Sequence, residues 1–141
     1  MACRTMDAVR YFFMEKLVKW YRRKDMPELL LNLIIPFVMI LVGYLFMKHP
    51  VWDMESHNGY NTPTSRKSQA HWDYAQSIAP GIFISLGKKL GVMEIALSGI
   101  LFLLPISIWV VVSVGNCVGA GVLIYGFCKT DSEIRKKFSE G

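Results

Sequence analysis

The stretch that decides the fold runs from Leu90 to Phe127 and reads LGVMEIALSGILFLLPISIWVVVSVGNCVGAGVLIYGF. These 38 residues carry a single charge, Glu94. As one α-helix they would extend about 57 Å, which is longer than a bilayer core is thick. Pro105 is the natural breaker, because the residue before a proline disfavours helical geometry. We therefore expect two antiparallel helices, from about Leu86 to Leu104 and from about Ile106 to Phe127, with a very tight connection.

A second uncharged run lies nearer the N-terminus, from Leu29 to Met47. As a helix it would be about 29 Å long, close to the thickness of the hydrocarbon core. A basic region precedes the run, as in a signal peptide, but the run is too long and no small-residue cleavage pattern follows it. We therefore expect a retained first transmembrane helix. Pro36 cannot donate a hydrogen bond to the carbonyl of Asn32, so a kink is expected in the first third.

These runs predict an all-α integral membrane protein with three transmembrane helices, a multi-pass protein of the cell membrane. The expected parts are a basic N-terminal arm (1–28), a membrane domain (29–127) that includes a loop (48–85), and a charged tail (128–141). Hydrophobic residues make up 52% of the chain, charged residues make up 19%, and the mean hydropathy is +0.31. This balance excludes a disordered chain and a soluble basic domain.

The charge pattern points to lipid as a partner. The formal net charge is +5, which on so apolar a chain favours anionic headgroups, and no nucleic-acid partner is expected. Seven Lys or Arg lie in the arm, and nine lie in the loop, the tail and the Lys88-Lys89 pair that follows the loop, so the positive-inside rule does not decide the orientation. The arm interleaves aromatic and basic residues, which is typical of an amphipathic helix in the headgroup plane. A basic tail that only sets topology is the alternative.

No pattern typical of catalysis or metal binding is present. Cys3, Cys117 and Cys128 are too scattered for a zinc site or a disulfide framework. The polar cluster at residues 49–57 matches no metal-ligand spacing. Ser-His-Asp, Cys-His, paired-carboxylate and phosphate-loop patterns are missing as well. We therefore expect a protein that is not an enzyme and that uses no cofactor or metal.

The loop contains the string GYNTPTSRKSQAHWDYAQ, from Gly59 to Gln76. Gly59 permits a positive φ and Thr62-Pro63 favours an extended backbone, which together predict a tight turn. Ser65 or Ser68 is placed to cap a following helix. Apolar residues recur in that helix at spacings of three and four: Trp72, Ala75, Ala79, Ile82 and Phe83. We expect it to lie along the interface with Trp72 at headgroup level, until Pro80-Gly81 bends the chain toward the second span.

This string resembles the shared segment of the SdpI family of bacterial membrane proteins. That segment has a Gly-Tyr-Arg-Thr turn, a serine-flanked basic residue and Trp-x-x-Ala, followed by two spanning helices. The matching residues are Gly59, Tyr60, Thr62, Ser65, Lys67, Ser68, Trp72 and Ala75. The similarity covers roughly residues 51–127. Asn61 stands in place of the arginine of the turn, so a role that depends on that charge does not carry over.

The resemblance implies a membrane-embedded immunity or regulatory protein. Such a protein protects a producing cell from a secreted peptide toxin or, in some members, tethers a repressor at the membrane. We place recognition in the loop, on Tyr60, Asn61, Thr62, Ser65, Lys67 and Trp72. The expected partners are membrane lipids and a toxin peptide or repressor protein. The identity of that partner, the sidedness of the loop and a homo-oligomeric state stay open.

Glu94 is a functional candidate, because an ionisable residue within the bilayer is expensive. Glu94 lies eleven residues before Pro105 and Asn116 eleven after, so both would sit about 16 Å from the turn, and Asn116 is the expected partner. One interpretation is an acid that holds the hairpin together. Another is a group that binds a proton, ion or cationic ligand in a small proton-coupled transporter subunit. In the third, Glu94 lies near the interface beside Lys88 and Lys89.

Small residues are expected to let the two hairpin helices approach each other. On the first helix Gly87, Gly91 and Ser98 share the face of Glu94. On the second, Gly115 and Gly119 form a Gly-x-x-x-Gly surface beside Asn116.

Overall fold

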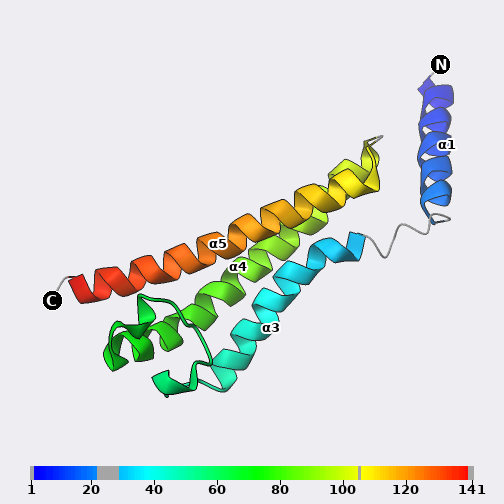
Figure 1. The fold of residues 1–141 in the computed structure, drawn as a ribbon. Helices are drawn as coiled ribbons and strands as arrows, with labels where there is room; N and C mark the ends of the chain where they lie inside the picture. The colour runs from blue at the N-terminus through cyan, green and yellow to red at the C-terminus, as the bar shows by residue number, and fades with distance from the viewer. Residues whose placement is uncertain (1, 22–28, 105, 140–141) are drawn as a thin grey trace.

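The computed structural model describes the backbone of residues 2–21, 29–104 and 106–139. Within these ranges the chain forms α-helices and short 3₁₀ turns and contains no strand, so the expected all-α class is confirmed. The elements in chain order are α1 (Ala2–Tyr21), η1 (Leu31–Leu33), α3 (Ile34–Lys48), η2 (Met54–Ser56), η3 (Ser65–Lys67), α4 (Gln69–Leu103) and α5 (Ile108–Ser139). Figure 1 shows α3, α4 and α5 side by side, with the loop between α3 and α4 folded at one end.

The first apolar run is helical over almost the range expected. The backbone is already helical at Leu29, passes through η1 and continues as α3 to Lys48. Pro36 is the third residue of α3. Its missing N–H matters little there, because the first four N–H groups of an α-helix have no partner within the helix. The chain changes from 3₁₀ to α geometry just before Pro36, and the kink itself stays a prediction.

The helices α4 and α5 form the expected antiparallel hairpin (Figure 1). α4 ends at Leu103 and α5 begins at Ile108, so the helices break around Pro105, although Pro105 itself lies outside the described residues. The connection is tight, because the N–H of Ile106 already donates to the carbonyl of Leu104 at 2.8 Å.

The separate helix expected before Pro80-Gly81 does not form, because α4 is a single helix of 35 residues that runs through Pro80. A proline inside a helix costs about 3 kcal/mol through its lost hydrogen bond and its ring. Here Ala79 and Pro80 are buried, and the carbonyl of Pro80 lies only 3.0 Å from where a side chain on Gly43 of α3 would begin. Close packing on α3 offsets the loss. The segment around Trp72 is therefore the first part of α4 and not a separate interfacial helix.

The charged tail expected from residue 128 is helical too. α5 continues without a break past Phe127 to Ser139. One side of this extension is buried at Thr130 and Ile134, and Ile134 packs in a core cluster with Tyr60, Ala75 and Ala79. The end of α5, the start of α4 and the loop thus form one packed unit, which we call the head (residues 49–79 and 128–139).

Small residues let the helices approach, but against a different neighbour from the one expected. A Cβ added to Gly115 or Gly119 would collide with Asn32 or Ile35 of the first apolar helix. A Cβ added to Gly87 would lie 3.0 Å from the carbonyl of Pro36. The Gly-x-x-x-Gly surface therefore lies at the contact of α5 with the first apolar helix. The glycines of α4 and α5 together allow that helix to pack closely against both. The expected contact of these two small-residue faces with each other is therefore wrong.

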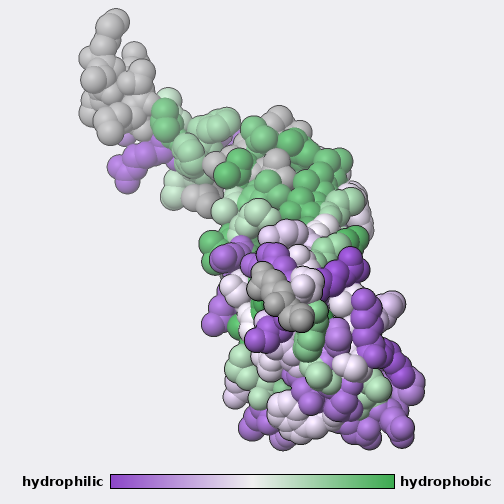
Figure 2. All heavy atoms as spheres, turned by 90° about the vertical axis from the view of Figure 1, so that its left-hand side faces the viewer, coloured by the Kyte–Doolittle hydropathy of each residue, from purple (hydrophilic) through white to green (hydrophobic). Residues whose placement is uncertain are grey.

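The surface is divided between an apolar part and a polar end. In Figure 2 hydrophobic residues gather over the upper part, and hydrophilic residues gather over the lower end, where the head lies. Two helices among the described residues are long and apolar enough to cross a membrane, Leu31–Lys48 and Ile108–Ser139. The apolar half of α4 carries Lys88, Lys89 and Glu94.

The N-terminal arm is helical over α1, and the described side chains from Asp7 to Lys16 are all exposed. The ammonium of Lys16 lies 5.2 Å from the ring centroid of Phe12, a pairing of basic and aromatic side chains along one face. The side chains of residues 17–21 and all of residues 22–28 lie outside the described part. Placement of the arm in the headgroup plane stays a prediction.

Candidate binding site

The turn of the motif is held by a glutamine from α4. Gly59 has φ +90°, as its place in the motif predicts, and a Cβ there would also collide with Oε1 of Gln76. That oxygen accepts from the backbone N–H of Tyr60 at 3.0 Å, and Nε2 of Gln76 donates to the carbonyl of Tyr60 at 2.9 Å. Gln76 therefore satisfies both backbone groups of Tyr60, and glycine leaves the room for it.

Tyr60 lies at the centre of the site and is only 6% exposed. Its ring stacks on Phe127 at 5.6 Å between centroids, and its hydroxyl lies 2.9 Å from Oδ1 of Asp131 and 3.0 Å from the carbonyl of Phe127. Burial, together with the hydrogen bond and the negative charge of Asp131, raises the pKa of Tyr60 far above its ordinary value. The phenol stays protonated and serves as a donor.

Asp131 joins the loop to α5. Besides Tyr60, its carboxylate accepts from the hydroxyl of Thr62 at 2.8 Å and from that of Thr64 at 3.2 Å. Both of its oxygens are used, and all three donors come from the loop. Sequence reasoning missed Asp131. The available signal was a loop with five hydroxyl side chains and no carboxylate between Gly59 and Gln69, which favours an acceptor from elsewhere in the chain.

The two serines of the motif have different roles. Ser68 caps α4, because its Oγ accepts from the backbone N–H of His71 at 3.3 Å. Ser65 is fully buried, and its Oγ accepts from the N–H of Thr62 at 2.9 Å and lies 3.2 Å from the carbonyl of Tyr60. Ser65 thus closes the turn, while the capping expected of either serine belongs to Ser68.

Trp72 is the largest fully buried side chain among those described, with 0% exposed, so its expected place among the headgroups is wrong. Its indole N–H donates to the carbonyl of Val51 at 2.9 Å. The helical face predicted from spacing does exist, since Ala75 and Ala79 are buried next to it, but it packs inside the head. Long-range packing of the loop and α5 over this face could not be seen from its periodicity.

The remaining loop candidates are at the surface. Asn61 and Lys67 are exposed, whereas Tyr60, Thr62, Ser65 and Trp72 are buried or half-buried. The amide of Asn61 makes only a long contact, 3.5 Å, with the carbonyl of His57. Of the predicted site residues, Asn61 and Lys67 are the ones whose side chains are free to meet a partner. The others shape the site from within.

A cavity of about 290 Å³ lies beneath the turn, where α3, α4, α5 and the loop meet. The volume is close to the lower end of the range for small-molecule pockets. Its lining is apolar apart from the amides of Asn61 and Gln76. The residues that line it are Val38, Met39, Val42, Gly43, Phe46, Gly59, Tyr60, Asn61, Gln76, Ala79, Pro80, Phe83, Leu123 and Phe127. The motif therefore forms the rim of an apolar cavity.

The intramembrane pair expected from the hairpin, Glu94 with Asn116, does not form. The amide of Asn116 donates to Oδ1 of Asn32 at 3.3 Å and to the carbonyl of Val112 at 2.9 Å. Asn32 is 2% exposed, and its amide reaches the carbonyl of Val111 at 3.4 Å. The hydrogen-bond partner of Asn116 therefore comes from the first apolar helix, as Asn32, and not from Glu94.

Glu94 is fully buried, and neither of its carboxyl oxygens has a hydrogen-bond partner among the described residues. Glu94 faces the inside of the bundle, whereas Lys88 and Lys89 of the same helix are exposed. A buried carboxyl group without partners in an apolar bundle is unusual and requires a reason.

The geometry defines an all-helical protein with two described helices long and apolar enough to cross a membrane, and its loop is closed onto its last helix over an apolar cavity. The sequence model of the SdpI/YfhL protein family matches residues 53–126, more than half of the chain. The chain belongs to this family. The match includes the turn, the Gln76 clamp and most of the cavity lining from α4 and α5, while Asp131 lies just beyond its end. No curated protein and no solved structure matches the chain.

Proposed function

We propose that this chain is a multi-pass protein of the cell membrane that acts by binding. It holds a peptide toxin, or a protein partner such as a repressor, at the cavity beneath the motif turn. The observation that carries the proposal is the cavity itself, because its rim is formed by the residues that mark the family and its walls come from every helix of the bundle.

Three spans are the membrane arrangement that we propose. The first apolar helix crosses the bilayer, the apolar half of α4 returns, and the first part of α5 crosses again. The head stays outside the lipid because it gathers the hydrophilic residues at one end of the molecule (Figure 2). The cavity then lies next to the membrane surface, between lipid and head.

The proposed mechanism is binding of the ligand in the cavity, without a chemical step. An apolar cavity with two amides at its rim suits an apolar side chain of a peptide whose backbone runs along the turn. Asn61 offers the amide that is not already used, since Gln76 is committed to Tyr60. Lys67 adds an exposed positive charge on the same loop. A toxin that binds here is removed from the bilayer. A repressor that binds here is held at the membrane.

The second candidate is a small proton-coupled transporter subunit that works through Glu94. Its support is the buried carboxyl group that lacks a hydrogen-bond partner among the described residues. Lone intramembrane carboxyl groups are typical of proton relays. Binding remains the better supported function because no polar path among the described contacts joins Glu94 to the head.

Two adjacent residues of α5 provide a matched test. Leu123 lines the cavity, whereas Ile124 is 63% exposed and points away from it. The variants Leu123→Trp, Ile124→Trp and Glu94→Gln are produced in a bacterial host that is killed by a secreted peptide toxin encoded by a neighbouring gene. We expect Leu123→Trp to abolish survival, because the indole fills the cavity, and the other two variants to protect as the parent does.

The control for folding is the amount of each variant in the membrane fraction, together with its resistance to trypsin at the exposed residues Arg66 and Lys67. Full protection by an intact Leu123→Trp protein would contradict binding at the cavity. Loss of protection in Glu94→Gln, with protection retained in Leu123→Trp, would favour the transporter instead.

A further inference from the structure

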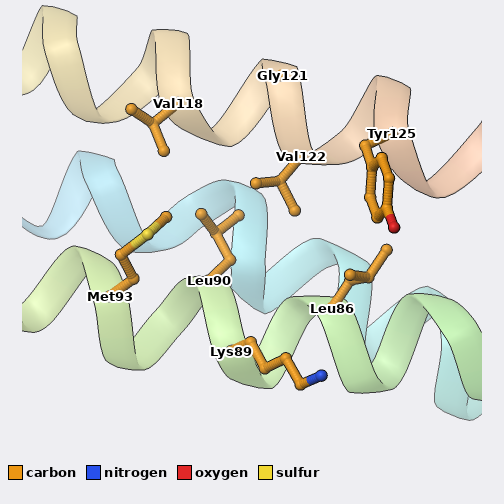
Figure 3. Close-up of a pocket in the computed structure, with 8 residues that line it drawn as sticks. All are labelled: Leu86, Lys89, Leu90, Met93, Val118, Gly121, Val122 and Tyr125. Carbon is orange, nitrogen blue, oxygen red and sulfur yellow. The ribbon is translucent and has the colours of Figure 1, made fainter.

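Among the described residues, no charged side chain is placed to balance an ionised Glu94. The first apolar helix carries no charge over residues 29–47, and α5 carries none over residues 108–127. Lys89 precedes Glu94 by five residues on α4, but it is exposed, and Figure 3 shows its ammonium group on the side of α4 away from α5. A buried charge without a partner is costly. Glu94 therefore requires a cation or a proton.

Asn32 of the first apolar helix lies level with Glu94. Glu94 shares one face of α4 with Gly87 and Gly91, which precede it by seven and three residues. A Cβ added to Gly87 would lie 3.0 Å from the carbonyl of Pro36, and one added to Gly91 would lie 3.7 Å from the Cβ of Pro36. The two helices run in opposite directions (Figure 1). The next turn of α4, with Glu94, therefore meets the turn before Pro36, with Asn32.

Asn116 of α5 lies at the same level. Its amide donates to Oδ1 of Asn32 at 3.3 Å. Figure 3 shows Met93 of α4 opposite Val118 of α5, and Glu94 and Asn116 are one and two residues away from these along the chain. One carboxyl group and two carboxamide groups, from three helices, thus lie in one layer of the apolar bundle.

The backbone at Asn32 departs from α-helical geometry. Asn32 is the middle residue of the 3₁₀ turn η1, and Pro36 has no N–H to donate to its carbonyl. In membrane proteins, backbone carbonyls at interruptions of a helix coordinate sodium ions or protons. Asn32 therefore has two oxygen atoms in this layer, one from the backbone and one from the side chain. Asn116 adds Oδ1, which no described hydrogen bond uses.

We propose that Glu94, Asn32 and Asn116 bind one sodium ion between the three helices. The single carboxylate matches the charge of a monovalent cation, whereas calcium sites combine several carboxylates. The neutral oxygens of the two asparagines supply the oxygen ligands that hard cations prefer. The ion connects the helices, because each of them provides a ligand. The inference goes beyond toxin or repressor binding and does not depend on it, since the cavity beneath the turn uses none of these residues.

A proton alone explains this layer less well. A neutral carboxylic acid donates one hydrogen bond, but neither oxygen of Glu94 has a hydrogen-bond partner among the described residues. A sodium ion between the carboxylate and the amide oxygens joins groups that do not bond to each other directly. It also balances the negative charge without leaving an unpaired donor.

The test is thermal unfolding of the full chain in detergent at neutral pH, followed by circular dichroism. Sodium chloride is compared with potassium chloride and choline chloride at equal ionic strength. A ligand that binds only the folded state raises the unfolding midpoint as its concentration exceeds the dissociation constant. We expect the parent midpoint to rise by about 4 °C per tenfold increase in sodium in this range, and not in choline. Glu94→Gln should show no dependence on sodium.

Glu55→Gln is the matched control, because it makes the same change at an exposed carboxylate of the loop. Its midpoint should respond to sodium as that of the parent does. Equal parent midpoints in sodium chloride and choline chloride would overturn the proposal, and so would an unchanged sodium response in Glu94→Gln. A midpoint that depends on pH but not on sodium would assign the layer to a proton instead.

Equilibrium dialysis of the parent against radioactive sodium gives a second readout that needs no variant. We expect one ion bound per chain, displaced by unlabelled sodium and not by choline. Absence of bound sodium at concentrations that saturate the thermal shift would contradict the site, because the shift would then come from a general salt effect.

Discussion

Replacing Asp131 with alanine is expected to open the loop while the helices stay in place. Asp131 accepts from the hydroxyls of Tyr60, Thr62 and Thr64, and a buried donor that loses its acceptor costs about 1–3 kcal/mol. Thr64 is 4% exposed and has no other hydrogen bond in the described contacts. We expect a loss of about 2 kcal/mol or more, measured as roughly 30-fold faster tryptic cleavage at Arg66 and Lys67 in detergent.

Glu133→Ala is the matched control, since it removes a carboxylate two residues further along the same helix. Glu133 forms an exposed pair with Lys136 at 3.3 Å, and such a pair contributes at most about 0.5 kcal/mol. Cleavage in this variant should stay close to that of the parent. Equal cleavage rates in the Asp131→Ala variant and the parent would show that the loop is held by other contacts.

The other large effect is expected from Trp72→Ala. The indole is fully buried and donates to the carbonyl of Val51, so the variant leaves both a cavity and an unpaired acceptor. Truncation of a buried tryptophan costs about 3–5 kcal/mol. Equilibrium unfolding in mixed detergent micelles, followed by circular dichroism, should show this loss as a lower midpoint.

Trp52→Ala provides the comparison in the same loop, because Trp52 is 56% exposed. Its midpoint should move little, as expected for a surface substitution. If Trp72 instead lay among headgroups, the two variants would unfold alike. Equal midpoints would therefore contradict the buried head.

Hydropathy and proline positions predicted the helices well. The uncharged run from Leu29 became a helix of nearly the expected length, and the hairpin breaks around Pro105. These features depend on local properties: absence of charge, helical length and the geometry that proline imposes. The continuity of α4 through Pro80 was missed because packing against Gly43 of α3 overrides the local preference of proline to end a helix.

The partners of the site residues could not be predicted in the same way. The motif identified Gly59, Tyr60 and Trp72 but not what they contact. Asp131 lies 71 residues from Tyr60 along the chain, and Asn32 lies 84 residues from Asn116. Both pairings depend on how three helices assemble, and a single sequence carries no signal for that. The equal distances of Glu94 and Asn116 from Pro105 predicted a pair between them, but Asn116 bonds to Asn32 instead.

The molecule combines an apolar bundle with a polar head, and the cavity lies where they meet. Tyr60 connects the loop to both long helices. Its backbone is hydrogen-bonded to Gln76 of α4, and its hydroxyl is hydrogen-bonded to Asp131 of α5. A ligand that enters the cavity meets a rim whose shape depends on this link. The central claim about the site is therefore that the hydrogen bond between Tyr60 and Asp131 joins the loop to α5.

A double-mutant cycle on Tyr60→Phe and Asp131→Ala, read out as tryptic cleavage at Arg66 and Lys67, tests that claim most directly. Phenylalanine keeps the stacking on Phe127 and removes only the hydroxyl. Residues that share a hydrogen bond should couple by about 1 kcal/mol, so the loss of the hydroxyl should matter much less once Asp131 is gone. Effects that add to within about 0.3–0.5 kcal/mol would show that the loop and α5 are not joined through this pair.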